Sequence, residues 1–228
     1  MLTRETLPDL DERAFLRAIT ARPEDDLPRL IYADYLDERG DPRGEFIRVQ
    51  VALGRPDTPW SDGDVRQLRA RERLLLYQHR SAWLGRLDGE WRGDAVFERG
   101  FVVQVDVSAT QFVRHAQAWL RREPIRRAAL YGSVSCMREL ALCTALKHLT
   151  VLSLRNNELR REHVAQLLRS PYLTRLVELD LGNNHLGPAT GGLVAKVQTL
   201  PRLEVYHFDG NYNPRDVDDE VLEVVRVT

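Results

Sequence analysis

A short pattern of leucines and one asparagine recurs at a constant distance in the second half of the chain. Residues 149–159 read Leu-x-x-Leu-x-Leu-x-x-Asn-x-Leu, and residues 176–186 repeat the pattern in every place. Residues 203–211 repeat it again, with tyrosine and phenylalanine in the second and third leucine places. Successive copies start 27 residues apart. A constant period of this length indicates stacked copies of one strand-and-helix unit, because a single unit cannot bury its own apolar side.

This pattern resembles leucine-rich repeats of the ribonuclease-inhibitor type. The resemblance implies an α/β fold, a short right-handed solenoid with parallel strands on a concave face and helices on a convex face. Two strands are predicted before the repeats, one over residues 97–107, where apolar and polar residues alternate, and a degenerate one over residues 124–130. Helices are expected over residues 110–122, 133–145, 160–169 and 188–198. Residues 96–228 therefore form the predicted leucine-rich-repeat domain.

The asparagine of each copy has a predicted structural role. Asn157 and Asn184 stand where a strand ends and the backbone bends, which leaves peptide groups without strand partners. A side-chain amide can donate and accept hydrogen bonds at the same time. We therefore expect both side chains to bind open backbone groups inside the fold, a structural task and not a catalytic one.

The first half of the chain has the apolar spacing of helices. We predict helices at residues 11–23, 25–40, 46–54 and 65–87, and a loop at residues 55–63. Pro23, Gly40 and Gly54 stand at the predicted ends of the first three helices, where proline and glycine commonly stop a helix. Together these helices form the predicted N-terminal domain, residues 1–95.

Residues 24–50 combine several short motifs in one stretch. The motifs are Arg29-Leu30, Tyr32-Ala33-Asp34, Leu36, Gly40-Asp41 and Glu45-Phe46-Ile47-Arg48. In this order they resemble the repeat-companion domain, a small bacterial module at the N-terminus of proteins that continue into leucine-rich or other repeats. The resemblance covers roughly residues 11–54, and Tyr35 departs from it, since tryptophan is expected there. It implies that repeats follow, and it implies no biochemical activity.

Within the same stretch, acidic residues alternate with arginines at helical or near-helical spacing. This pattern is typical of ion pairs and helix caps inside a domain, and each exposed pair contributes about 0–1 kcal/mol. A metal or acid–base cluster is the less favoured interpretation. We expect Asp34 and Arg48 to form the most buried of these pairs.

The strand residues between the repeated leucines should face away from the helices and form a surface. From the first repeat strand to the last, the charge of this surface changes from basic to acidic. A graded charge of this kind suits a polar partner with opposite ends. The residues that we expect to bind a partner protein are Arg126, Tyr131, Ser153, Arg155, Glu178, Asp180, His207 and Asp209.

Two kinds of chemistry could use the same surface. Ser153, Asp180 and His207 occupy one repeat position, but a catalytic triad needs the nucleophile in contact with the base. Neighbouring strands lie about 4.8 Å apart, so the serine and the histidine would stand two strands apart with the acid between them. We expect no catalysis and no cofactor. Glu178, Asp180, His207 and Asp209 bring together oxygen and imidazole ligands, and a metal-binding or enzymatic site there is kept as an alternative.

A cluster of basic residues offers another alternative. The chain has 33 basic and 34 acidic residues, so it creates no overall basic field that would attract nucleic acid. Arginine beside aromatic side chains can nevertheless bind single strands. The residues concerned are Arg121, Arg122, Arg126 and Arg127, with Trp119 and Tyr131 nearby. A regulatory subunit that binds nucleic acid through Arg121–Arg127 is therefore the alternative function.

The features that bear on location favour the cytoplasm. The first residues lack the apolar core of a signal peptide, and no apolar run approaches membrane-spanning length. Cys136 and Cys143 lie seven residues apart, on one face of a predicted helix, and buried free thiols fit a reducing compartment. We expect a cytoplasmic, non-enzymatic interaction module or scaffold whose partner is another protein and which does not bind a membrane.

Overall fold

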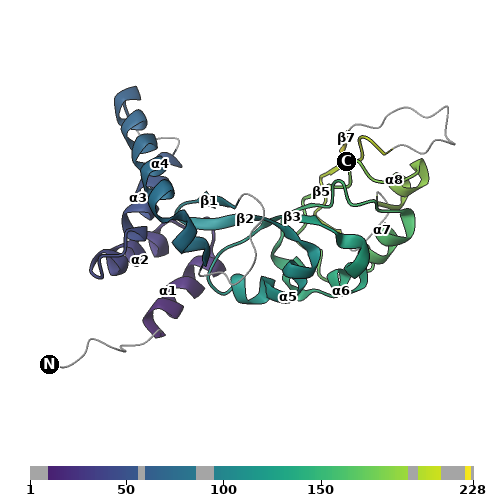
Figure 1. The fold of residues 1–228 in the computed structure, drawn as a ribbon, viewed down its shortest axis with the longest axis horizontal. Helices are drawn as coiled ribbons and strands as arrows, with labels where there is room; N and C mark the ends of the chain where they lie inside the picture. Colours follow the sequence, from purple (N-terminus) through teal and green to yellow (C-terminus); the bar gives the residue numbers. More distant parts are fainter. Residues whose placement is uncertain (1–9, 56–59, 86–94, 195–199, 212–223, 227–228) are drawn as a thin grey trace. The chain divides into compact units, whose positions relative to one another are not determined.

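The computed structural model describes residues 10–55, 60–85, 95–194, 200–211 and 224–226 (Figure 1). Over these residues the protein is a mixed α/β fold with a mostly parallel sheet. The chain divides into two compact units. The first unit comprises Met1–Asp88, Val96–Val103 and Ala118–Pro124, and the second unit comprises Gly89–Ala95, Gln104–Gln117 and Ile125–Thr228. Two segments beyond the expected domain boundary at residue 95 thus belong with the N-terminal helices.

The N-terminal helices form where the apolar spacing predicts them. They are α1 (Leu10–Ala21), α2 (Leu27–Asp37), α3 (Arg43–Leu53) and α4 (Asp62–Gly85). At the start of α2 the side chain of Asp25 accepts a hydrogen bond from the backbone N–H of Leu27. Beyond its end, Gly40 adopts a φ of 67°, the conformation in which glycine commonly ends a helix. The stop signal that the sequence predicted at Gly40 is confirmed.

A hairpin replaces the first strand that the sequence predicted. β1 (Val96–Glu98) and β2 (Phe101–Ser108) are neighbours in the sheet, joined by Arg99 and Gly100, whose φ angles are 51° and 85°. A side chain at Gly100 would place its Cβ 2.2 Å from Cγ1 of Ile47, so only glycine lets this turn pack against α3. The expectation of one continuous strand was wrong, because alternation of apolar residues does not reveal a two-residue turn within the run.

Aromatic side chains fill the core of the first unit. Phe101, at the start of β2, is fully buried and lies against Tyr32 of α2 with a ring distance of 6.1 Å. Phe46 of α3 stacks on Trp83 of α4 with a ring distance of 4.6 Å. The first residues of β2 are therefore part of the helical core, which aromatic rings with large apolar surfaces stabilise.

The buried ion pair of the first unit is not the one that the sequence suggested. Arg43 donates to both carboxylate oxygens of Glu123, at 2.6 and 2.9 Å, and the two side chains are only 4% and 2% exposed. Glu123 also accepts a hydrogen bond from the backbone N–H of Val102 at 2.7 Å. Arg48 does pair with Asp34, but their side chains are 36% and 73% exposed. The expectation of a buried Asp34–Arg48 pair was wrong, because helical spacing indicates which charges can meet and not which are covered.

The second unit is built on parallel strands whose register follows the 27-residue spacing. The strands are β3 (Arg127–Tyr131), β4 (Val151–Ser153), β5 (Glu178–Asp180), β6 (Val205–His207) and β7 (Val224–Arg226). The order in the sheet is β1 to β7, with β2 to β6 parallel and β7 antiparallel to β6. Leu152 pairs with Leu179, and Leu179 with Tyr206. Equivalent residues of the three copies therefore stand side by side.

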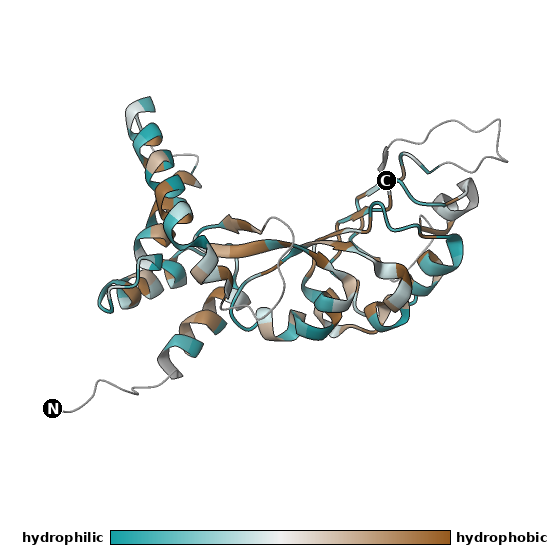
Figure 2. Cartoon of the chain, in the orientation of Figure 1, coloured by the Kyte–Doolittle hydropathy of each residue, from teal (hydrophilic) through white to brown (hydrophobic). Residues whose placement is uncertain are grey.

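Helices alternate with these strands along the chain. They are α5 (Ala109–Trp119), α6 (Met137–Ala141), α7 (Arg161–Leu167) and α8 (Pro188–Val194). Helices α5, α6 and α7 lie on one side of the strands in Figure 1. Figure 2 shows hydrophobic residues concentrated on the strands and hydrophilic residues on the outer sides of these helices. The core of the second unit thus lies between the helices and one face of the sheet.

The helix expected over residues 133–145 is interrupted. Short 3₁₀ turns at Ser133–Cys136 and Thr144–His148 stand before and after α6. Cys136 and Cys143 are both free and buried, but they flank α6 and do not share one helix face. Burial raises the pKa of the Cys143 thiol.

Residues 195–198 of the last expected helix lie outside the described residues. Each of the described helices is too short or too polar to cross a membrane.

Candidate functional site

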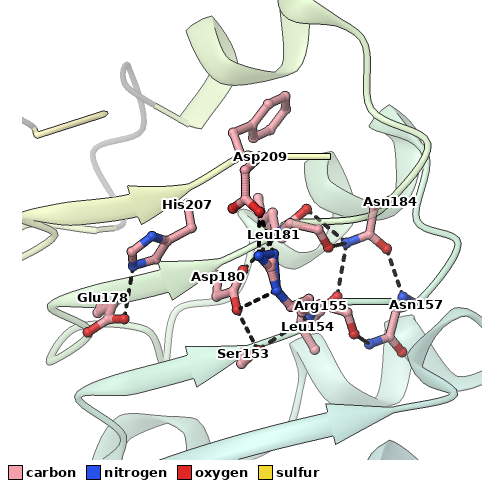
Figure 3. A network of polar contacts seen from close by, with 12 residues as sticks. Ser153, Leu154, Arg155, Asn157, Glu178, Asp180, Leu181, Asn184, His207 and Asp209 are labelled. Carbon is pink, nitrogen blue, oxygen red and sulfur yellow. Dashed lines mark hydrogen bonds and ion pairs between the residues drawn. The ribbon is translucent and has the colours of Figure 1, made fainter. Parts of the chain in front are cut away.

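Three neighbouring strands present polar side chains on the face opposite the leucine core. In β4, β5 and β6 the middle residue is buried and its two neighbours are half-buried. Because side chains alternate along a strand, the middle residues face the helices and the flanking residues face away from them. We call this surface the polar strand face (Figure 3) and define it by Ser153, Arg155, Glu178, Asp180, His207 and Asp209. Six of the eight residues expected to bind a partner therefore lie together.

Arg155 reaches across two strands of this face. Its Nη1 donates to Oδ2 of Asp209 at 2.9 Å, and its Nη2 donates to the same oxygen. Its Nε lies 3.7 Å from Oδ2 of Asp180. The side chains of Arg155 and Asp209 are each about one third exposed. The surface charge was expected to change from basic to acidic along the strands. At Arg155 this change is interrupted, because carboxylates of the later strands compensate the positive charge of its guanidinium.

The long path of the Arg155 side chain is explained by the residue at the equivalent position of the next copy. The residues at this position in the three successive copies are Arg155, Gly182 and Asp209. A Cβ on Gly182 would lie 1.9 Å from Nη1 of Arg155, so the missing side chain leaves the path from the arginine to the aspartate open. Gly182 was not among the residues expected at this site from the sequence. The series arginine, glycine, aspartate at one position is the signal that could have identified it.

Ser153, Asp180 and His207 do not assemble into a catalytic triad. The hydroxyl of Ser153 donates to Oδ2 of Asp180 at 2.9 Å, and Nε2 of His207 lies 3.0 Å from Oε1 of Glu178 (Figure 3). The histidine thus contacts an acid of the neighbouring strand, whereas a general base must contact the nucleophile. Among the described residues, no group of three or more histidine, cysteine or acidic side chains is arranged to hold a metal ion.

The other two residues expected to bind a partner lie on or beside β3. Tyr131, at the end of β3, is exposed, and Arg126, the residue before β3, is half-buried. Next to Arg126, the Nε of Arg127 donates to Oε1 of Gln104 on β2 at 3.0 Å. The basic end of the sheet is therefore partly engaged in contacts within the second unit, and Tyr131 provides its exposed aromatic ring.

At the ends of the repeat strands, three asparagines form a ladder. Oδ1 of Asn184 accepts hydrogen bonds from the backbone N–H groups of Asn157 and Leu159, both at 2.9 Å. Its Nδ2 donates to backbone carbonyls of the preceding copy and of its own copy. Asn211 accepts from the N–H of Asn184 at 3.1 Å, and Asn157 accepts from the N–H of Ser133 at 2.8 Å. The structural role expected for Asn157 and Asn184 is confirmed.

The arginine cluster contains a tryptophan that is not available for stacking. Trp119 is buried, so no nucleic-acid base can stack on its indole ring, although Arg121 and Arg122 are exposed. This arrangement weakens the case for single-strand binding at the cluster.

Comparisons of the chain with protein-family models, with curated proteins and with solved structures found no match.

Proposed function

We propose that this chain is a non-enzymatic protein-interaction module that binds its partner through the polar strand face. In this proposal residues 96–228 form a short leucine-rich-repeat solenoid with that face on its concave side. Residues 1–95 form a helical domain of the repeat-companion type. The pairing of equivalent leucines in β4 and β5 supports the solenoid, because stacked repeats place equivalent residues side by side.

The observation that best supports the proposal is that the side chains of the polar strand face are held in place by contacts with one another. Its side chains bind one another across β4, β5 and β6 through an arginine–aspartate pair, a serine–aspartate hydrogen bond and a histidine–glutamate contact. Side chains that are held in place before binding lose less conformational entropy when a partner arrives. A preorganised polar surface of this kind favours a specific contact with another macromolecule.

The charge of the face indicates what the partner carries. Glu178, Asp180 and Asp209 contribute three carboxylates, against the single guanidinium of Arg155. A partner with basic side chains opposite this surplus is complementary in charge, which increases specificity and the rate of association. At the other end of the sheet, Tyr131 adds a residue type that is enriched among the side chains that dominate binding energy.

Affinity capture from the native host with matched variants tests the proposal. The tagged full chain is compared with Tyr131→Ala, Asp180→Ala and His207→Ala, and with the helix-side controls Arg161→Ala and Gln166→Ala. A partner should be retained by the wild type and both controls and lost by at least one face variant. Titration of that partner should show a loss of about 1 kcal/mol or more for at least one face variant. Loss of binding in the two controls alone would contradict the assignment of the face.

The same protein distinguishes the two alternative functions. Oligonucleotide binding that weakens steeply with salt and depends on Arg121 and Arg122 would indicate a nucleic-acid-binding subunit. A rise in melting temperature with a divalent metal ion, lost in Asp180→Ala, would indicate a metal site.

The buried free thiols of Cys136 and Cys143 support a cytoplasmic location, because reduced thiols persist there.

A further inference from the structure

Helix α4 carries an exposed stripe on the side opposite its buried residues. Leu75 and Trp83 mark the side of α4 that is buried in the first unit. Residues three and four positions apart on a helix lie on one face. Four exposed residues have this spacing on the other side of α4, and we call them the α4 stripe: Arg66, Ala70, Arg73 and Tyr77.

Tyr77 has the highest exposed fraction among the exposed large hydrophobic residues of the described chain. Its exposed fraction is 90%, and Leu74, one helical turn before it, is 42% exposed. Residues three positions apart are neighbours on a helix surface, so Leu74 and Tyr77 together form one exposed spot with apolar surface. A tyrosine ring left in water forgoes the burial of a large apolar surface. Tyrosine and arginine are also the residue types that dominate binding energy at protein interfaces, so this spot has the composition of a contact point.

The two arginines of the stripe differ from their neighbours on the same helix. Arg69 and Arg71 each form an ion pair with a glutamate, at 3.0 and 2.5 Å. Within the part of the chain that the structure describes, no carboxylate pairs with Arg66 or Arg73. Seven residues at about 1.5 Å each separate these two arginines by roughly 10.5 Å along the helix axis. These two arginines, neither of which forms an ion pair with a described carboxylate, therefore lie about two helical turns apart on the face that carries Tyr77.

We propose that the α4 stripe docks an acidic helical segment of a partner protein. Two carboxylates seven positions apart on that segment match the spacing of Arg66 and Arg73, since a seven-residue repeat keeps contacts on one seam between two helices. An apolar side chain one turn further along packs on Tyr77 and Leu74. This surface goes beyond the proposed function, because it uses none of the residues of the polar strand face.

Two other occupants suit the stripe less well. A second copy of the chain that paired through the same helix would place four arginines in one interface, and this excess of positive charge opposes the pairing. A nucleic-acid strand would meet positive charge at the stripe itself. The net charge of −1 over the whole chain, however, gives none of the long-range attraction that dominates nucleic-acid binding. An acidic protein segment satisfies both the charges and the apolar spot.

Fluorescence anisotropy with the full-length chain tests this proposal. The probe is a labelled alanine-rich helical peptide with two glutamates seven positions apart and a leucine one turn after the second. A matched peptide has lysine in place of each glutamate. We expect the acidic peptide to bind at least about tenfold more tightly than the lysine peptide, and Tyr77→Ala and Arg73→Glu to weaken it by about tenfold each. Arg138→Glu, the same charge change at an exposed residue of α6, should leave its affinity unchanged.

Charge reversal gives the sharpest outcome. The double variant Arg66→Glu/Arg73→Glu should prefer the lysine peptide, and all variants should melt with the wild type because the substituted residues are exposed. Equal binding of the two peptides to the wild type would overturn the proposal, as would unchanged affinity in Tyr77→Ala and Arg73→Glu. Tighter binding of a single-stranded oligothymidine than of the acidic peptide would assign the stripe to nucleic acid instead. Each of these outcomes leaves the test of the polar strand face unaffected.

Discussion

The first unit buries a charged pair, whereas the second unit buries the neutral amides of Asn157 and Asn184 at the ends of its strands. Arg43 and Glu123 are 80 residues apart in the chain and form a single pair. Asn157, Asn184 and Asn211 follow one another at steps of 27 residues, and Asn184 and Asn211 each accept from the backbone of the preceding copy. The buried charged pair of the first unit thus occurs once, whereas the second unit repeats the same amide contact between neighbouring copies.

This difference predicts how the stability of each unit should respond to amino-acid substitutions. A buried charge that loses its partner remains out of water, so a single substitution of the partner strongly lowers the free energy of unfolding. Loss of one amide leaves a few backbone groups unpaired, while the other copies keep their own hydrogen bonds. We therefore expect a large effect from a single change in the buried charged pair of the first unit and smaller, local effects from the loss of one amide in the second.

The largest effect should follow the removal of residues 1–90. Phe101 would lose the aromatic core around it, and Glu123 would lose its ion pair with Arg43, so fragment 96–228 would expose apolar surface to water. The fragment should be insoluble, or melt without cooperativity in a thermal scan and bind a hydrophobic dye. A monomeric fragment that melts cooperatively would show that the second unit does not need the first.

Replacement of one partner of the buried ion pair should come next. Glu123→Ala leaves the Arg43 guanidinium buried and unpaired, and the free energy of unfolding should fall by about 3–5 kcal/mol. The matched control is Asp34→Ala, which breaks the exposed pair with Arg48 and should cost about 0–1 kcal/mol. Urea unfolding measures both. Similar losses in the two variants would mean that Arg43 and Glu123 are solvated in solution.

The asparagine ladder should give intermediate effects. Asn184→Ala leaves the N–H groups of Asn157 and Leu159 without acceptors, and Asn157→Ala leaves the N–H of Ser133 in the same state. Each variant should lose about 1–3 kcal/mol in urea unfolding. Arg161→Ala, at the exposed start of α7, serves as the control and should stay within about 0.5 kcal/mol of the wild type. Unchanged stability in both asparagine variants would refute the ladder.

The smallest effect should be found on the polar strand face. Arg155→Ala breaks a pair that is about one third exposed, and exposed pairs contribute about 0.2–1 kcal/mol. Gly182→Ala should destabilise the wild type slightly, because the new Cβ displaces the guanidinium from Asp209. In an Arg155→Ala background the same change should cost nothing. A double-mutant cycle in thermal or urea unfolding measures this coupling, and strict additivity of the two changes would contradict the described path of Arg155.

Local and periodic features were predictable from the sequence. Apolar spacing and terminal residues such as Gly40 were sufficient for helices α1 to α4, because both act within a few residues of the chain. The constant repeat placed Leu152 beside Leu179 and Asn157 beside Asn184, and it also predicted which side chains share the polar strand face. The hairpin at Gly100 and the interrupted helix around α6 escaped prediction, since neither changes the apolar pattern strongly.

The repeat alone determined which residues of the second unit are neighbours, because equal spacing along the chain becomes lateral spacing between strands. Only the tertiary structure decided which charges compensate one another. The long side chain of Arg155 lies within reach of carboxylates on two strands, and the missing Cβ of Gly182 directs it to Asp209. Glu123 meets Arg43 only after helices and strands from distant parts of the first unit have packed together. Such pairings depend on the packed shape of many elements at once, which local spacing does not contain.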